Sequence, residues 1–308
     1  MNSGWTATLT VTSILASPRR KPIHDPVFAE RHRLVAGAGR GMRDGQDRHA
    51  VSVGDFVDLL DANEPEPAAR VNPDGASPFV LIGDHGGRRV PRRLDNLGLD
   101  DAERARHIGW DIGVTALGTR LAGCLDAVFI HQIYSRLVID CNRAPGATDA
   151  IPEVGDGTVI PGNAALGPDA RAARAAAVHA PYHAALAGEL TRRAARGQAT
   201  VLVALHSFTP IMRGFARPWH CGILHNGAND TVARAMLGGL RAEPGLVVGD
   251  NEPYAMDAID YTVPRHAFAA GLAYVEIEVR QDLLADDAGI DEWAARLARL
   301  LLEATRTI

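Results

Sequence analysis

Short apolar runs alternate with longer amphipathic stretches from Pro78 to the C-terminus. The short runs predict strands, and the longer stretches, in which apolar residues recur every three or four positions, predict helices. The predicted strands are 79–83, 127–131, 136–141, 200–206, 221–225, 246–248 and 273–279, and the predicted helices are 102–122, 169–196, 230–241 and 290–305. This alternation predicts a three-layer α/β/α sandwich with a mostly parallel or mixed central sheet.

The N-terminal part of the chain lacks such a pattern. Residues 1–50 contain eight Lys and Arg but only four Asp and Glu. Residues 62–78 contain Asn-Glu-Pro-Glu-Pro and Asn-Pro-Asp-Gly, which are typical of linkers and turns. One short helix is expected between these segments, at 51–60. We therefore expect a loosely structured extension and linker over 1–76, followed by one α/β domain over 77–308.

Composition excludes several classes of function. The chain has 32 Lys and Arg against 37 Asp and Glu, a net charge of −5, so a general binder of nucleic-acid backbones is not expected. Lys21 is the only lysine, which leaves no candidate for a Schiff-base or phosphate-loop lysine in the α/β domain. The three cysteines are widely separated and form no Cys-x-x-Cys motif, which disfavours a disulfide scaffold and a cysteine-rich zinc module.

The sequence gives no sign of a membrane segment. No apolar stretch approaches the roughly 20 residues of a membrane span. The mildly apolar stretch at 5–16 is a poor signal peptide, because no basic residue precedes it. We therefore expect a cytoplasmic protein without a membrane partner.

Three predicted strands lead directly into a histidine, namely His85, His206 and His225. In open α/β sheets, ligands bind beyond the carboxyl ends of the strands. Histidines at equivalent sheet ends would suit a catalytic zinc ion, which takes three protein ligands and a water molecule. A histidine that ends a strand can also be a simple polar cap on the core, so spacing alone leaves both interpretations open.

A third ligand could come from two pairs spaced four residues apart, His107 with Asp111 and His179 with His183. On a helix this spacing places both side chains on one face. A solvated or helix-stabilising face would explain either pair equally well. Asp84 precedes the first strand-end histidine, but neighbouring side chains on an extended chain point in opposite directions. We therefore expect Asp84 to point away from the site.

The last predicted strand carries two carboxylates. Its alternation places Tyr274, Glu276, Glu278 and Arg280 on one face. A carboxylate on a rigid strand could act as a general base. The alternative is an edge strand with one solvent-exposed face.

The predicted strand 136–141 leads into a polar cluster that contains Asn142 and Arg143, with Arg136 at its start. Arginine binds carboxylates through two parallel hydrogen bonds, and asparagine adds a neutral donor and acceptor. The cluster is compatible with anionic substrate binding and equally with a salt bridge inside a loop.

Six segments of the chain resemble motifs that occur in the same order in the N-formylglutamate amidohydrolase family, and together they cover about residues 77–305. The resemblance implies that 77–308 is a catalytic domain of a hydrolase related to the zinc carboxypeptidases and aspartoacylases. It implies Zn²⁺ or another divalent metal as cofactor and a small N-acyl amino acid, such as N-formylglutamate, as substrate. The segments are Asp84-His85-Gly-Gly, His107-Ile-Gly-Trp-Asp111-Ile-Gly, Tyr134-Ser-Arg-Leu-Val-Ile-Asp-Cys-Asn-Arg143, His206-Ser-Phe-Thr-Pro210, Asn251-Glu-Pro-Tyr254 and Glu278-Val-Arg-Gln-Asp-Leu283.

The same resemblance assigns roles to individual residues. His85 and His206 match the histidine ligands of the metal, Asp111 matches a recurrent aspartate, and Glu278 matches the general base. Asn142 and Arg143 resemble a pair that binds the substrate carboxylate, and Arg136 resembles an arginine that stabilises the oxyanion.

One position departs from the carboxypeptidase pattern. Those enzymes take two ligands from His-x-x-Glu, whereas Arg88 stands at the last position of that motif here. Either Asp111 supplies the missing ligand or the metal site is altered. Two alternatives therefore stay open, namely a carboxypeptidase or amidase acting on another N-acyl amino acid, and a non-catalytic ligand-binding member that lacks metal.

Overall fold

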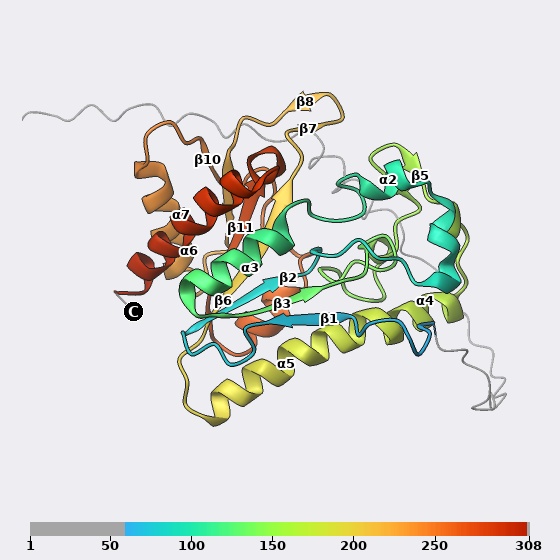
Figure 1. The fold of residues 1–308 in the computed structure, drawn as a ribbon, viewed down its shortest axis with the longest axis horizontal. Helices are drawn as coiled ribbons and strands as arrows, with labels where there is room; N and C mark the ends of the chain where they lie inside the picture. Colours follow the sequence, from blue (N-terminus) through green and yellow to red (C-terminus); the bar gives the residue numbers. More distant parts are fainter. Residues whose placement is uncertain (1–58, 307–308) are drawn as a thin grey trace, which may run out of the picture.

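A seven-stranded sheet runs through the centre of the molecule in the computed structural model, which describes residues 59–306 (Figure 1). In spatial order the strands are β1 (Ala68–Val71), β3 (Val128–Gln132), β2 (Phe79–Gly83), β6 (Val201–Phe208), β11 (Ala273–Arg280), β9 (Cys221–Leu224) and β10 (Val248–Asp250). Strands β3, β2, β6 and β11 are parallel, and β1 pairs antiparallel with β3. Strand β9 pairs antiparallel with β11 and parallel with β10. The sheet is therefore mixed, with a parallel centre.

Successive side chains of a strand point to opposite faces of the sheet, so both faces of this sheet are apolar. Helices cover both of them. On one face, Leu81 and Val203 belong to an apolar cluster with residues of α3, α6 and α7. On the other face, Val80 and Leu202 belong to a cluster with residues of α5. This arrangement confirms the predicted three-layer α/β sandwich. The helices are α3 (Val114–Leu125), α5 (Ala180–Ala195), α6 (Thr231–Ala242) and α7 (Asp287–Thr305).

The remaining elements are short and lie in the connections between strands and long helices. One of them, η5, joins α4 to α5, so that helical structure is continuous over 168–195 and confirms the predicted helix 169–196. The short elements are η2 (Arg92–Gly98), α2 (Asp101–Ala105), η3 (Thr148–Ala150), β4 (Val154–Gly155), β5 (Thr158–Val159), η4 (Pro161–Asn163), α4 (Pro168–Arg174), η5 (Ala175–His179), β7 (Ile211–Met212), β8 (Phe215–Ala216), η6 (Pro264–Phe268) and η7 (Gln281–Leu284).

The predicted helix 102–122 is wrong in its first half. Helix α2 ends at Ala105, and the chain makes turns until α3 begins at Val114. Gly113 has a φ of 87° at the start of α3, a value that glycine adopts without strain. The carbonyl of Gly109 accepts hydrogen bonds from the backbone of Arg136 and from the hydroxyl of Ser135, at 3.1 and 2.7 Å. The segment between the helices is thus a tethered loop, and His107 and Asp111 do not share a helix face.

The predicted strand 136–141 is also wrong, because this segment forms turns. Its apolar residues do not join the sheet. Leu137, Val138 and Ile139 instead fill a third core cluster together with Ile108 and Ile160. The run is apolar because the loop is buried, and a short apolar run cannot by itself distinguish a buried loop from a strand.

The sheet begins earlier than the predicted start of the domain at 77, because β1 pairs along its whole length with β3. The proposed extension therefore contributes an edge strand to the fold. Residues 1–58, and with them nearly all of the short helix expected at 51–60, lie outside the described residues. Within residues 59–306, no helix combines the length and the apolar character that crossing a membrane requires.

Candidate metal centre and active site

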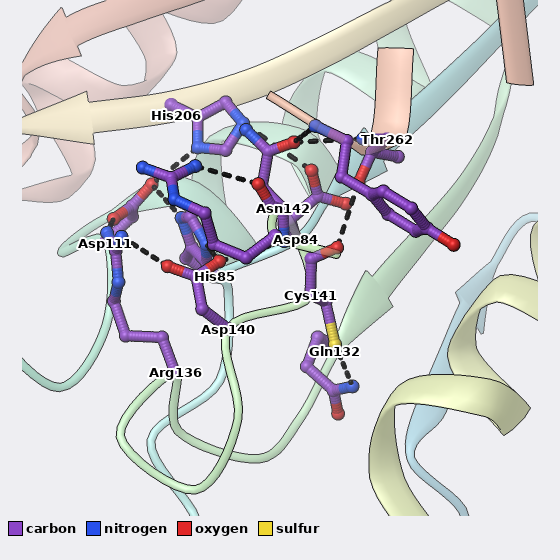
Figure 2. Close-up of polar contacts among 12 residues, drawn as sticks. Asp84, His85, Asp111, Gln132, Arg136, Asp140, Cys141, Asn142, His206 and Thr262 are labelled. Carbon is purple, nitrogen blue, oxygen red and sulfur yellow. Dashed lines mark hydrogen bonds and ion pairs between the residues drawn. The ribbon is translucent and has the colours of Figure 1, made fainter. Parts of the chain in front are cut away.

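Three predicted ligands converge at the carboxyl ends of β2 and β6. His85 lies in the turn directly after β2, His206 lies near the end of β6, and Asp111 lies in the loop before α3. Each offers one ligand atom, and these atoms lie within 4.8 Å of one another (Figure 2). All three side chains are buried. Among the described residues this is the one group of histidines, cysteines and carboxylates found with such spacing.

His85 is oriented by a carboxylate on each side of its ring. Its Nε2–H donates to Oδ1 of Asp140 at 2.6 Å, while Nδ1 lies 3.5 Å from Oδ2 of Asp111 and has no hydrogen-bond partner. The backbone N–H of Asp111 also donates to the carbonyl of His85, at 2.9 Å. The bond to Asp140 fixes the tautomer and leaves the Nδ1 lone pair facing Asp111, as in a histidine prepared to bind a metal.

His206 repeats this arrangement with different partners. Its Nδ1 lies 2.9 Å from Oδ2 of Asp111, and its unpartnered Nε2 lies 3.7 Å from Oδ2 of Asp84. The hydroxyl of Tyr182 donates to the other oxygen of Asp84 at 2.6 Å. Burial opposes protonation of His206, but the hydrogen bond with Asp111 and the charge of Glu276 outweigh it and raise the pKa of this imidazole. The surrounding carboxylates therefore make the position favourable for a cation.

The expected orientation of Asp84 is wrong. The chain turns at Asp84 and His85 instead of continuing as an extended strand, and the backbone N–H of Gly86 closes the turn onto the carbonyl of Gly83 at 3.3 Å. The turn brings the Asp84 carboxylate to His206. Asp84 is 1% exposed, and its Oδ2 has no hydrogen-bond partner.

Arg136 lies between the two carboxylates that flank His85. Its Nη2 donates to Asp140 at 2.6 Å, and its Nη1 lies 3.6 Å from Asp111. The Arg136 side chain is 26% exposed, whereas those of Asp111 and Asp140 are each 5% exposed. The guanidinium therefore lies on the more open side of the group. Asp140 was missed by the sequence analysis because it was placed within a predicted strand.

Glu278 lies on β11 directly opposite His206 on β6. Its side chain is buried, and Oε2 has no hydrogen-bond partner. Burial raises the pKa of Glu278 to about 7, against the opposing charge of His206. Because β11 lies between β6 and β9, the alternative of an edge strand with one wet face is wrong. Glu276, two residues earlier, also has a raised pKa, chiefly through burial.

Asn142 and Arg143 are engaged by protein groups. The Asn142 side-chain oxygen accepts hydrogen bonds from the backbone of Tyr261 and Thr262, both at 3.0 Å (Figure 2). The Arg143 side chain donates to Asp149 at 3.0 Å, and its Nη1 lies 3.8 Å from Asp260. Their role in substrate binding stays a prediction, and the contacts to 260–262 indicate that they also join two loops.

Arg217 and Tyr254 are two further polar residues to which the sequence assigned no role, although Tyr254 ends the motif Asn251-Glu-Pro-Tyr254. Arg217 is 2% exposed and donates to the Tyr254 hydroxyl at 3.0 Å. The charge of Arg217 acts on Glu278 and partly offsets the effect of burial on its pKa. No spacing rule pointed to a contact between them, because the chain segments that carry them are far apart in the sequence.

Two predicted histidines lie outside the candidate site. His225 follows β9, which runs antiparallel to β11, so it points toward the opposite end of the sheet from His206. There it lies 3.0 Å from Asp230 and 2.8 Å from Asp250. His107 lies 3.4 Å from Asp156. The expectation of three histidines at equivalent strand ends is therefore correct for two.

His179 and His183 belong to a separate buried group, here called the histidine stack, with His266 as its third member. The rings of His179 and His183 are 4.3 Å apart, and those of His183 and His266 are 5.2 Å apart. Carbonyls of Cys141 and Arg143 accept hydrogen bonds from this stack at 2.9 and 3.0 Å. The pair predicted as a possible source of metal ligands instead supports the segment that carries Asp140.

Arg88, which stands at the position of the glutamate of the carboxypeptidase motif, is not among the residues of the metal-ligand group. Its guanidinium lies 5.3 Å from the centre of the Trp110 ring. Asp111 lies within the metal-ligand group, and its role as the third ligand stays a prediction.

Comparison with known proteins identifies the family and the fold of this chain. A model of the N-formylglutamate amidohydrolase family matches residues 77–285. A gene product of Agrobacterium tumefaciens of known structure is 32% identical over 81% of this chain and 98% of its own, with a TM-score of 0.78. An N-formylglutamate amidohydrolase from Ralstonia eutropha JMP134 shares the fold, with 21% identity, a TM-score of 0.59 and coverage of 79% of this chain and 98% of its own. The comparison with curated proteins gave no match. The family match over most of the chain confirms the resemblance inferred from the six motifs, and the chain belongs to the N-formylglutamate amidohydrolase family.

Proposed function

We propose that this amide-bond hydrolase cleaves N-acyl amino acids, with N-formylglutamate as the first substrate to test, by means of a divalent metal ion held by His85, Asp111 and His206. One observation carries the proposal: three buried ligand atoms converge within 4.8 Å, and the buried carboxylate of Glu278 lies opposite one of the ligands. The unpartnered Nδ1 of His85 and Nε2 of His206 fit a metal centre, because buried nitrogen atoms without a partner are otherwise unfavourable. Two imidazoles and a carboxylate are a ligand set found in catalytic zinc sites.

A zinc ion bound here would lower the pKa of a bound water molecule and polarise the substrate carbonyl. The other contributions come from the chain itself. Glu278, with a pKa of about 7, accepts a proton from the attacking water and delivers it to the leaving nitrogen. For N-formylglutamate the water adds across the amide bond, so that formate and glutamate are the products.

Arginines supply the positive charge that an anionic substrate and transition state need. Arg136, on the open side of the group, stabilises the oxyanion that forms as the carbonyl is attacked. Arg143 and Asn142 bind the carboxylate of the amino acid, and this step requires Arg143 to exchange a contact with Asp149 for the substrate. The proposal further includes that the substrate is a small molecule, that no nucleic acid is a partner, and that the protein is cytoplasmic.

Metal analysis combined with product assays tests the proposal. Purified protein should contain one divalent ion per chain and release formate from N-formylglutamate, and His85→Ala should lose both properties. His225→Asn is the matched control, because it changes a buried histidine paired with carboxylates that lie outside the metal-ligand group. Metal-free wild-type protein without formate release would contradict the proposal.

The same purified protein also tests the two alternative functions, hydrolysis of another N-acyl amino acid and ligand binding without catalysis. A panel of N-acetyl and N-succinyl amino acids and dipeptides identifies the acyl group and distinguishes an amidase or carboxypeptidase from a formyl hydrolase. Protein that binds these compounds without metal and without turnover would instead be a ligand-binding member. The unpartnered nitrogen atoms of His85 and His206 favour the catalytic alternative.

A further inference from the structure

A cavity of about 480 Å³ lies outside the metal-ligand group and is lined by four arginines. It is bounded by the segment that precedes β1, the loop after His85, and α2. Here it is called the arginine cavity, and its basic residues are Arg88, Arg89, Arg92 and Arg104. The proposed reaction uses none of these four residues.

The positive charge of the arginine cavity is only partly compensated. Its two acidic lining residues are Glu64 and Asp101. Asp101 forms an ion pair with Arg104, and Glu64 accepts hydrogen bonds from the backbone of Asp61 and Arg92, at 2.9 and 3.0 Å. Over residues 59–306, the guanidinium groups of the other three arginines form no ion pair. Three like charges around one hollow repel one another, and a bound anion would relieve that repulsion.

The backbone that carries these arginines is firmly held. The N–H of Arg89 donates to the carbonyl of Ile133 at 3.1 Å, and the carbonyl of Arg89 accepts from Ser135 at 2.7 Å. Gly87 packs so closely that an added Cβ would lie 2.1 Å from the carbonyl carbon of Ile133. A ligand that binds here therefore has little backbone to order, which lowers the entropic cost of binding.

Arg88 also has a partner that defines its place in the cavity wall. The guanidinium lies over the Trp110 ring, a contact that neutralises no charge and leaves its N–H donors available. Guanidinium groups bind carboxylate and phosphate oxygens through two parallel hydrogen bonds. The size of the cavity suits a small molecule, and its charge suits one with more than a single negative charge.

We propose that the arginine cavity is a binding site for a small multivalent oxyanion, either a polycarboxylate or a phosphate. The site is separate from the metal-ligand group, and its ligand is held by Arg88, Arg89 and Arg92, with Arg104 already paired to Asp101. The proposal stands independently of the catalytic one. The arginine cavity and the metal-ligand group are carried by neighbouring residues of the chain, because Arg88 lies three residues after His85 and its partner Trp110 adjoins Asp111.

Titration calorimetry with two probes tests the site. Inorganic phosphate and propane-1,2,3-tricarboxylate are titrated separately into the full-length protein at low and at high NaCl. We expect saturable binding of at least one probe with one anion per chain, and weaker binding at high salt because charged contacts are screened. Preference for one probe then identifies the ligand as a phosphate or as a polycarboxylate.

Variants assign the binding to this cavity. The double variant Arg88→Ala/Arg92→Ala should weaken binding at least tenfold, and Arg89→Lys, which keeps the charge but loses the planar fork, should weaken it several-fold. Arg120→Ala is the matched control, because Arg120 is an exposed arginine on α3 that pairs with Asp291 at 2.9 Å; it should leave binding unchanged. Circular dichroism of each variant checks that it is folded, which is expected because all the substituted residues are exposed. Absence of saturable binding of both probes, or unchanged binding to the double variant, would overturn the proposal.

Discussion

The part of the protein that the structure describes, residues 59–306, contains two buried groups of histidines with opposite electrostatic surroundings. In the metal-ligand group, His85 and His206 face the carboxylates of Asp84, Asp111 and Asp140, and the pKa values of both imidazoles are raised in spite of burial. In the histidine stack, burial lowers the pKa of His183 to about 2 and that of His266 to about 4. Burial alone therefore does not identify a metal ligand. The groups that face the imidazole decide whether the position attracts a cation or excludes one.

The contacts of the histidine stack explain its different role. Carbonyl oxygens only accept hydrogen bonds, so His179 and His183 must each present an Nε2–H to Arg143 and Cys141. The Nδ1 of neutral His183 then accepts from Nε2–H of His266, 2.9 Å away. The hydrogen bonds from His179 and His183 thus both end on one backbone segment, and His266 supports it through His183. The stack holds the segment whose Asp140 orients His85, and it supports the metal-ligand group without belonging to it.

The largest expected effect is that of Asp111→Asn, because Asp111 contacts both histidines of the metal-ligand group. The amide keeps the size of the side chain and removes its charge. We expect metal affinity to fall by more than about a hundredfold, beyond the usual effect of losing an outer partner of a ligand, and formate release to be lost. Metal titration and the formate assay measure both. His183→Gln is the control from the other histidine group and should keep its metal; if it lost metal equally, the two groups would not be functionally distinct.

Glu278→Gln separates chemistry from metal binding at the same site. The change removes the base but none of the three proposed ligands, so metal content should stay at the wild-type value. General acid–base groups typically contribute about 10² to 10⁴ in rate, and kcat should fall by that factor. Full turnover by the metal-loaded variant would exclude Glu278 as the base.

Asp140→Asn tests the link between the two groups, because Asp140 lies on the segment that the stack supports and bonds to His85 at 2.6 Å. Outer partners of metal-bound histidines typically contribute about 10- to 100-fold to metal affinity or activity. We expect a loss in this range, smaller than that of Asp111→Asn. Equal losses in the two variants would indicate that Asp140 itself binds the metal.

Much of this arrangement could be predicted from the sequence, for physical reasons that differ between elements. Strands β2 and β6 are buried on both faces, so their continuous apolar runs identified them, and the rule that ligands bind at carboxyl ends then located His85 and His206. Strand direction leaves no local signal, so His225 was expected at the same sheet edge although β9 is antiparallel.

The outer partners of the site were harder to predict. Asp140 lies within an apolar run that forms a buried loop rather than a strand, so no side-chain alternation could place its carboxylate. Asp84 was expected to point away because the chain was taken as extended through His85, whereas the turn already begins at Asp84. The positions of both residues depend on contacts between segments distant in sequence, such as the hydrogen bonds that join the carbonyls of Cys141 and Arg143 to the histidine stack. A local pattern does not contain this information.

The smallest expected effect concerns stability and is specific to the histidine stack. The pKa values of His183 and His266 lie below the ordinary value of 6.5, so the unfolded chain takes up protons first as the pH falls. Their contribution to the free energy of unfolding is therefore complete above pH 6.5 and decreases below it, by about 1.4 kcal/mol per pH unit for each histidine. Glu278, whose pKa is raised to about 7, acts in the opposite direction over this range, but it does so equally in wild type and variant. From pH 7 to pH 5, the free energy of unfolding of His183→Gln in urea should therefore fall less, or rise more, than that of the wild type, since glutamine keeps a donor for the Cys141 carbonyl but does not titrate. An unchanged slope in His183→Gln would mean that His183 is protonated in the folded protein, and the contrast between the two histidine groups would then fail.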